Sequence, residues 1–175
     1  MHVDGDISSS GTIIGKTYKS EEVFCHSGAV GTGTYYFTIG ATNDADDSLN
    51  EVSTTPAVNL IQTAMCDTKI KRIKLNFHNT CDDLMLMQFK LRKWNGSGTI
   101  TTDGNWGDVG TAWSPSTGAD ISANDRLYHA PSDWTLSAGE IYGLVVYQIV
   151  STGTNIITFT GGIVLEEDWD EIINS

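Results

Sequence analysis

The sequence lacks paired cysteines, long apolar runs and a signal sequence. Its three cysteines are an odd number with no Cys-x-x-Cys pair, which argues against a disulfide framework and indicates reduced thiols. A Cys66–Cys81 bridge is the alternative. No apolar run approaches the roughly 18 residues of a membrane-spanning helix. Residues 1–6 have neither the basic nor the apolar region of a secretory signal. We therefore expect folding in a reducing cytosol, without export or membrane insertion.

Positive charge is also scarce. Ten Lys and Arg against 22 Asp and Glu give a formal net charge of −12, which repels phosphate backbones and anionic membranes. Nucleic acid is therefore not an expected partner. The basic residues gather at 69–74 and 90–93. We interpret these two clusters as the solvated faces of two strands that could be neighbours.

What the sequence does contain favours one β domain. Its 175 residues include 18 glycines and many Thr, Ser, Asn and Asp residues, which suit a chain with many turns. Alternating apolar and polar residues predict strands at 73–77 and 85–92. The pattern as a whole predicts about eight or nine strands. Further strands are predicted at 35–39, 100–102, 127–129 (an edge strand), 141–150 and 155–165, and residues 104–124 are predicted to form a long surface loop.

The chain divides into an arm or stem at 1–20, a β-sandwich at 21–165 and an acidic tail at 166–175. The arm sets isolated apolar residues among Gly, Ser and Asp, so it cannot build a core alone and is expected to order through assembly. The tail is either a short helix at 166–173 or an extended docking segment. The predicted assembly contacts are Val3, Ile7, Ile13, Ile14 and Trp169.

No catalytic, cofactor or metal site is predicted. There is no G-x-S-x-G elbow, and nothing in the sequence selects a pair of carboxylates for glycoside hydrolysis. Cys25-His26 and the 78–83 turn contain zinc-ligand types without the paired spacing of a structural site. The acidic stretch 43–51 lacks the glycine and distal glutamate of an EF-hand, so we interpret it as a solvated loop. We expect the protein not to be an enzyme.

Four tryptophans lie in or next to predicted loops, namely Trp94, Trp106, Trp113 and Trp134. Such rings either plug the open ends of a sandwich or stack on sugars and protein partners. Trp106 and Trp113 form the candidate ligand-contact loop.

Five stretches of the chain carry a family resemblance. They are the Gly/Ser/Ile-rich segment 3–15, residues 69–77 followed by 89–96, and residues 136–147 with the closing strand 156–165. This pattern resembles the jelly-roll modules of tailed-bacteriophage virion proteins found in capsid decorations, head fibres and tail fibres. The resemblance implies an antiparallel, jelly-roll-like β-sandwich preceded by a short extended arm.

The resemblance also implies a function and partners. It implies a homotrimer bound to other virion proteins such as capsid or tail, assembled in the cytoplasm of the bacterial host. The short chain favours a capsid-decoration or head-fibre subunit. The alternative is a tail-fibre receptor-binding tip or carbohydrate-binding module that contacts a host surface glycan through its loop aromatics. A glycan-degrading enzyme would require two converging carboxylates.

Overall fold

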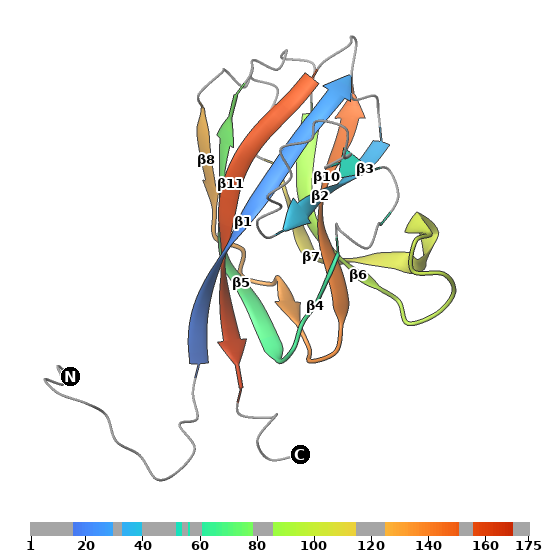
Figure 1. Ribbon diagram of the computed structural model, residues 1–175, viewed down its shortest axis with the longest axis vertical. Coiled ribbons are helices and arrows are strands. Elements are labelled where there is room, and N and C mark those ends of the chain that lie inside the picture. The colour runs from blue at the N-terminus through green and yellow to red at the C-terminus, as the bar shows by residue number, and fades with distance from the viewer. Residues whose placement is uncertain are drawn as a thin grey trace, which may run out of the picture.

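The computed structural model describes residues 16–29, 33–39, 52–53, 56, 61–78, 86–114, 125–150 and 156–169. Within these ranges the chain forms eleven strands and one 3-10 turn, with no α-helix (Figure 1). The all-β, antiparallel prediction is therefore confirmed. The elements are β1 (Lys16–Ala29), β2 (Gly33–Ile39), β3 (Val52–Ser53), β4 (Gln62–Thr63), β5 (Asp67–Phe77), β6 (Leu86–Trp94), η1 (Asp103–Asn105), β7 (Trp106–Trp113), β8 (Arg126–His129), β9 (Thr135–Leu136), β10 (Ile141–Val150) and β11 (Ile156–Asp168).

The long strands form the two layers of a sandwich. Sheet A has the order β8-β5-β11-β1, and sheet B has the order β7-β6-β10-β2. Strand β1 also joins the layers, because Val23 and Phe24 pair with Ile39 and Thr38 of β2. The short strands β3, β4 and β9 pair with β2, β10 and β5.

The connectivity of the eight long strands is that of a jelly roll. The first pairs with the last (β1 with β11), the second with the seventh (β2 with β10), the third with the sixth (β5 with β8) and the fourth with the fifth (β6 with β7). A chain folded back on itself as one ribbon of nested antiparallel pairs, and then wrapped into two sheets, gives this order. The predicted jelly-roll-like sandwich is therefore confirmed by the strand order itself.

The core fills the space between the sheets. Strand β5 alternates buried and partly exposed side chains along most of its length, as a strand with one solvated face does. Aromatic rings join the layers, since Phe159 of β11 lies 5.6 Å from Phe77 and 5.8 Å from Phe89 of β6 between ring centroids. The fully buried side chains include Trp134, Ile70, Ile73, Leu75, Leu144 and Ile163.

A bulge in β5 breaks this alternation. Val164 pairs with Arg72, whereas its neighbour Leu165 pairs with Ile70, so Lys71 is the extra residue. As a result Lys71 and Arg72 both point to solvent between buried Ile70 and Ile73. The bulge therefore places two consecutive cations on the outer face of sheet A.

Several predictions of local structure need correction. Residues 106–113 form β7 rather than part of a long loop, because Asp108 and Trp106 pair with Arg92 and Trp94 of β6. Residues 100–101 form a turn that leads into η1, not a strand. Strand β11 continues to Asp168, which excludes a helix starting at 166. Strands β1 and β11 also extend the sandwich beyond the predicted limits of 21 and 165.

The two basic clusters do not lie on neighbouring strands. Residues 69–74 belong to β5 in sheet A, and residues 90–93 belong to β6 in sheet B. The clusters therefore face away from each other on opposite sides of the sandwich. The predicted edge strand is confirmed as β8, which ends sheet A.

Candidate functional site

The outer face of sheet B, which we call the closed face, is covered by the segment 95–105 that joins β6 to β7. Trp106 anchors this cover, because its indole Nε1 donates to the Ile100 carbonyl at 2.7 Å. The Trp106 ring packs edge-on against Tyr36, with centroids 5.6 Å apart. Together with Val145 these rings form a second apolar cluster outside the sheet. The closed face is thus a small extra core.

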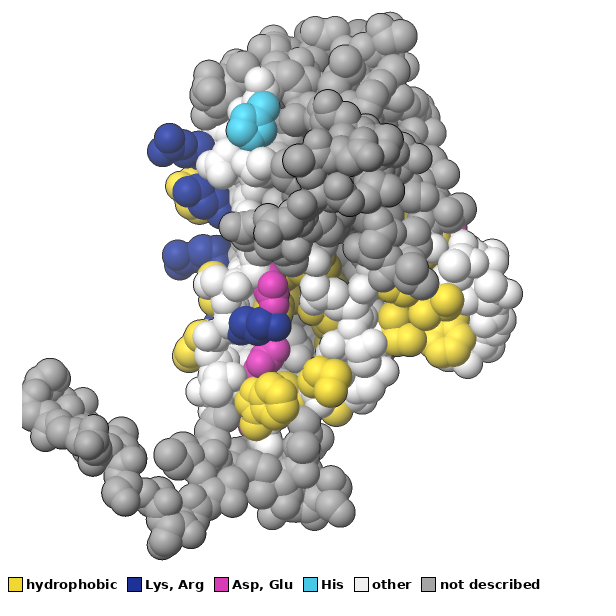
Figure 2. Space-filling view, viewed as in Figure 1, with side chains coloured by type: hydrophobic (Ala, Val, Ile, Leu, Met, Phe, Trp, Pro, Cys, Tyr) yellow, Lys and Arg dark blue, Asp and Glu magenta, His cyan; other side chains and the backbone are white. Residues whose placement is uncertain are grey.

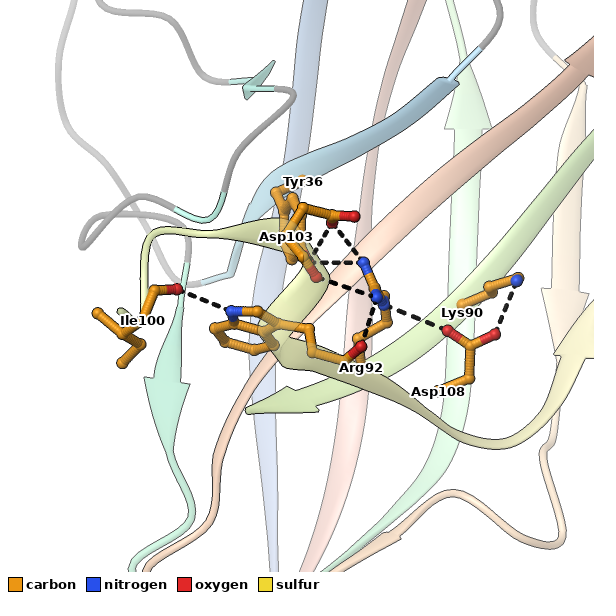
Figure 3. A network of polar contacts seen from close by, with 7 residues as sticks. Tyr36, Lys90, Arg92, Ile100, Asp103 and Asp108 are labelled. Carbon is orange, nitrogen blue, oxygen red and sulfur yellow. Dashed lines mark hydrogen bonds and ion pairs between the residues drawn. The ribbon is translucent and has the colours of Figure 1, made fainter. Parts of the chain in front are cut away.

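Arg92 of β6 ties the cover to the sheet (Figure 3). Its Nη1 donates to Tyr36 Oη at 2.9 Å and ion-pairs with Asp103, while Nη2 donates to the Trp106 carbonyl at 2.6 Å. Tyr36 Oη in turn donates to Asp103 at 2.9 Å. One guanidinium therefore bonds to β2, to η1 and to the start of β7.

The remaining cations of β6 are also paired. Asp108 lies 3.2 Å from Arg92 Nε and 2.7 Å from Lys90 Nζ, so its two oxygens bridge the two cations. Lys93 ion-pairs with Glu140. All three positive charges of this strand therefore meet a carboxylate within the chain.

The protonation states of this network are fixed by its surroundings. Burial raises the pKa of Tyr36, although the charge of Arg92 opposes the shift, so the phenol keeps its proton. Burial alone would raise the pKa of Glu140, but the hydrogen bond from Lys93 and further contacts leave it below its usual range. The network is therefore a set of fixed ion pairs that stabilises the cover.

The outer face of sheet A, which we call the open face, has no such cover among the described residues. Where β1 begins, its charges are paired: Glu166 accepts from Tyr18 Oη at 3.0 Å and lies 3.3 Å from both Lys16 and Lys71. The hydrogen bond from Tyr18, and then that from Lys71, lower the pKa of Glu166. This half of the open face is therefore held together by its own ion pairs.

The other half of the open face is arranged in rows by the strand register, because directly opposed residues point to the same side of a sheet. On β11, β5 and β8 the rows are Val164-Arg72, Gly162-Lys74-Tyr128 and Thr160-Asn76-Arg126. On β1 the residues that pair with the first member of each row are Ser20, Glu22 and Phe24. Lys74 Nζ lies 5.6 Å from the centre of the Tyr128 ring. No carboxylate among the described side chains forms an ion pair with Arg72, Lys74 or Arg126. In Figure 2 dark blue side chains project from the left side of the molecule, over β5 and β8.

This half of the open face is hollowed, and we call it the cationic hollow. One depression of about 460 Å³ lies against Arg72, Lys74 and Tyr128, and a second of about 420 Å³ lies against Lys74 and Arg126. Gly162 contributes to the space because it has no side chain between Lys74 and β1. A Cβ on Gly162 would meet only a backbone oxygen at 3.4 Å.

The adjacent Gly161 has a different role. A Cβ there would lie 2.0 Å from the Lys74 carbonyl oxygen, inside any possible contact distance. Only glycine therefore lets β11 approach β5 at this point. Gly161 positions the strand, whereas Gly162 opens the surface.

The distribution of charge separates the strands from the rest of the chain. All ten basic residues lie in the described ranges, together with 11 of the 22 acidic residues, which leaves a formal charge of −1 there. The remaining 11 acidic residues lie in the other segments of the sequence, with no basic residue beside them. The cationic hollow is therefore a local positive site on an acidic protein.

The predicted ligand-contact loop at Trp106 and Trp113 is not supported by their positions. Both belong to β7, and Trp106 is 4% exposed with its indole N–H already bonded. Trp113 is partly buried, with its ring 4.9 Å from the His129 ring in a parallel stack. A side chain that closes the protein's own core cannot stack on a sugar. The exposed aromatic side chains of the described ranges are Tyr18, at 67%, and Tyr128, at 58%, and Tyr128 is the one that lines the cationic hollow.

The predicted assembly residues fall mostly outside the described residues. This applies to Val3, Ile7, Ile13 and Ile14. Trp169 is partly exposed, and its indole N–H donates to Thr17 Oγ1 at 3.1 Å. It follows the end of β11, where Asp168 pairs with Lys16. Strand β1 therefore begins beside the end of β11 (Figure 1).

The residues considered for metal or thiol chemistry have ordinary roles where the structure describes them. Cys66 is a buried free thiol whose pKa is raised by burial, so it forms no bridge to Cys81. His78 is exposed, with Nε2 2.9 Å from Thr160 Oγ1. No group of three or more His, Cys, Asp or Glu in the described ranges is arranged to hold a metal ion. The stretch 43–51 and Cys81 lie outside the described residues.

Among the described helical segments, none is long and apolar enough to span a membrane.

One feature of the sequence could have pointed to the cationic hollow. Two adjacent cations, Lys71 and Arg72, interrupt the alternation between Ile70 and Ile73. Such an interruption marks a bulge with both side chains on the solvent face. Arg126 and Tyr128 gave no such signal, because only the pairing of β8 with β5 brings them to this face.

The comparisons with known proteins add little to this geometry. No family model matches the sequence, and no curated protein matches it. Among solved structures the fold is similar to a chain in the structure of infectious bursal disease virus, Gx strain. The similarity covers 97% of this chain and 36% of the viral chain, at 12% sequence identity and a TM-score of 0.40. This chain thus spans about a third of that one. Because the TM-score is so low, the jelly-roll assignment depends on the strand order alone.

Proposed function

We propose that this protein is a non-enzymatic structural subunit of a bacteriophage virion, of the capsid-decoration or head-fibre type. The observation that carries the proposal is the complete jelly-roll strand order, an architecture used by viral capsid proteins as well as by lectins and cupins. The step from fold to function is one of analogy. Among the functions that this fold serves, the resemblance of the Gly/Ser/Ile-rich segment 3–15 to fibre stems favours a structural role in a phage virion.

In this proposal the subunit is a homotrimer that attaches to capsid or tail proteins through its terminal segments. Two features support it. The sequence before β1 contains isolated apolar residues that cannot form a core alone, and β1 begins beside the end of β11. Both terminal segments could thus reach the same partner. Assembly would take place in the bacterial cytoplasm, where Cys66 stays a free thiol.

The test is the mass of the full chain in solution, measured by light scattering. We expect three times the chain mass of 19.0 kDa, falling to the monomer when Ile7, Ile13 and Ile14 are replaced by Asp. The matched control replaces Ser8, Ser9 and Ser10 by Asp, which adds the same charge to the same segment and should leave the trimer intact. A wild-type monomer at every concentration would refute the trimer.

A further inference from the structure

The cationic hollow is a site that the proposed assembly function does not use. We propose that it binds a saccharide carrying a single carboxylate, such as a uronic or sialic acid residue. The charge of the hollow, its shape and its hydrogen-bonding groups support this ligand. None of the three depends on whether the protein belongs to a virion.

The charge of the hollow favours an anion. Arg72, Lys74 and Arg126 have no ion pair with a described carboxylate, whereas every cation of β6 has one. The described carboxylate that lines the hollow, Glu21, ion-pairs with Lys19. Arginine presents a planar fork that fits a carboxylate with two hydrogen bonds. The hollow therefore offers an anion two such forks and one ammonium group.

The shape and polarity of the hollow favour a sugar. The two depressions of about 460 and 420 Å³ share Lys74, and each is within the size range of small-molecule sites. Asn76, His78 and Thr160 line the second depression and can hydrogen-bond to sugar hydroxyls. The exposed ring of Tyr128 lines the first, next to Lys74, and offers an apolar edge for a sugar ring.

Two other occupants fit the observations less well. A long polyanion would be repelled by the −12 charge of the whole chain, whereas a ligand with one carboxylate meets chiefly the local cations. A second copy of the protein would need a face with an apolar centre, because the cores of homodimer interfaces are depleted in charge. Around the hollow the described apolar side chains are few, chiefly Val164 and Tyr128.

The experiment is calorimetric titration of the full chain with 3′-sialyllactose and with galacturonate, which carry one carboxylate each, using lactose as the neutral control. We expect both acidic saccharides to bind and lactose not to bind. Arg72→Gln and Arg126→Gln should each weaken binding by about tenfold, since each removes a charged hydrogen-bonding partner. Gly162→Val should also weaken binding, because its side chain fills the hollow while its Cβ meets only one backbone oxygen, at 3.4 Å.

The matched control is Lys93→Gln, which removes the same charge from β6 of the other sheet, where Lys93 is paired with Glu140. It should change the affinity less than twofold if the contacts are local, which is about the limit expected of a screened distant charge. If Lys93→Gln lowered the affinity as much as Arg72→Gln does, the proposed site would be overturned, because the electrostatic field of the whole protein would then explain binding. The absence of binding by either acidic saccharide would also overturn it.

A change in solution mass on Arg72→Gln would also overturn the proposal, because it would make the face an interface between copies. This outcome differs from failure of the proposed assembly function, which is measured on the variants at Ile7, Ile13 and Ile14. The two proposals can therefore fail separately.

Discussion

The two outer faces of the sandwich both carry a basic strand, but the cations are ion-paired within the chain on one face and partly unpaired on the other. On its outer face strand β6 presents Lys90 and Arg92, and strand β5 presents a comparable run from Lys69 to Lys74. On the closed face a following segment folds back and supplies Asp103 and Asp108 to neutralise the cations. Beside the cationic hollow the neighbouring positions on β11 and β5 hold glycine, threonine and asparagine instead. Whether a basic strand is structural or available for a ligand is thus decided by its neighbours in space.

The difference also determines where the aromatic side chains go. On the closed face Trp106 is buried under its own cover, while on the open face Tyr128 stays 58% exposed. On the closed face the charged groups are already ion-paired and the rings are already buried, so neither is free to bind a partner. The comparison therefore predicts that substitutions on the closed face reduce stability, and that substitutions in the cationic hollow do not.

The largest expected effect is that of Trp106→Ala. The variant removes a 4% exposed ring and its hydrogen bond to Ile100, so it should lower the free energy of unfolding by about 3–5 kcal/mol. Tyr128→Ala, the matched aromatic on the open face, should cost no more than about 0.5 kcal/mol. Urea unfolding followed by fluorescence measures both. Similar losses in the two variants would mean that the faces do not differ in the way described.

A smaller effect is expected for Arg92→Leu. This variant leaves Asp103, Asp108 and the Trp106 carbonyl without their common donor. It should lower the free energy of unfolding by about 2–3 kcal/mol, which is less than for a fully buried ion pair because both carboxylates are partly exposed. The control is Arg72→Leu, whose guanidinium has no such partners and which should change stability by less than about 0.5 kcal/mol. Urea midpoints at one pH compare the pair. If Arg72→Leu lowered the stability more than Arg92→Leu does, the arginine that stabilises the fold would lie in sheet A and not, as described, in sheet B.

Much of the fold could be predicted from the spacing of apolar residues along the sequence. The alternation at 73–77 and 85–92 gave two strands of opposite sheets, and the continuous run from Tyr142 to Val146 gave a central strand that is buried on both sides. Strand β7 was missed because its Gly and Asp residues resemble a loop. Its pairing with β6 outweighs that local preference.

The sites were harder to predict, because they depend on contacts between distant strands. Trp106 was placed in an exposed loop since no local pattern shows that segment 95–105 folds back over it. Arg126 and Lys74 are 52 positions apart in the sequence and meet only through the pairing of β8 with β5. The sequence shows how many charges a strand carries, but it does not show which carboxylates of other strands pair with them.

The smallest expected effect concerns pH and separates the interior from the open face. The His129 ring stacks on Trp113, at 4.9 Å, and meets Trp134 edge-on, at 5.7 Å. This burial lowers its pKa below the ordinary 6.5, against the opposing charge of Asp133. The folded protein therefore holds the neutral ring, while the unfolded chain takes up a proton more readily. Stability is thus fully present above the unfolded pKa and is lost as pH falls through it.

Unfolding in urea at about pH 7.5 and about pH 5.5 measures this loss, because the unfolded imidazole gains its proton between the two. The His129→Gln variant should lose less stability over that interval than the wild type. The His78→Gln variant, altered at an exposed histidine of the open face, is the matched control. If the two variants lose equal amounts, the pH dependence lies elsewhere, and the ring between Trp113 and Trp134 tolerates its charge.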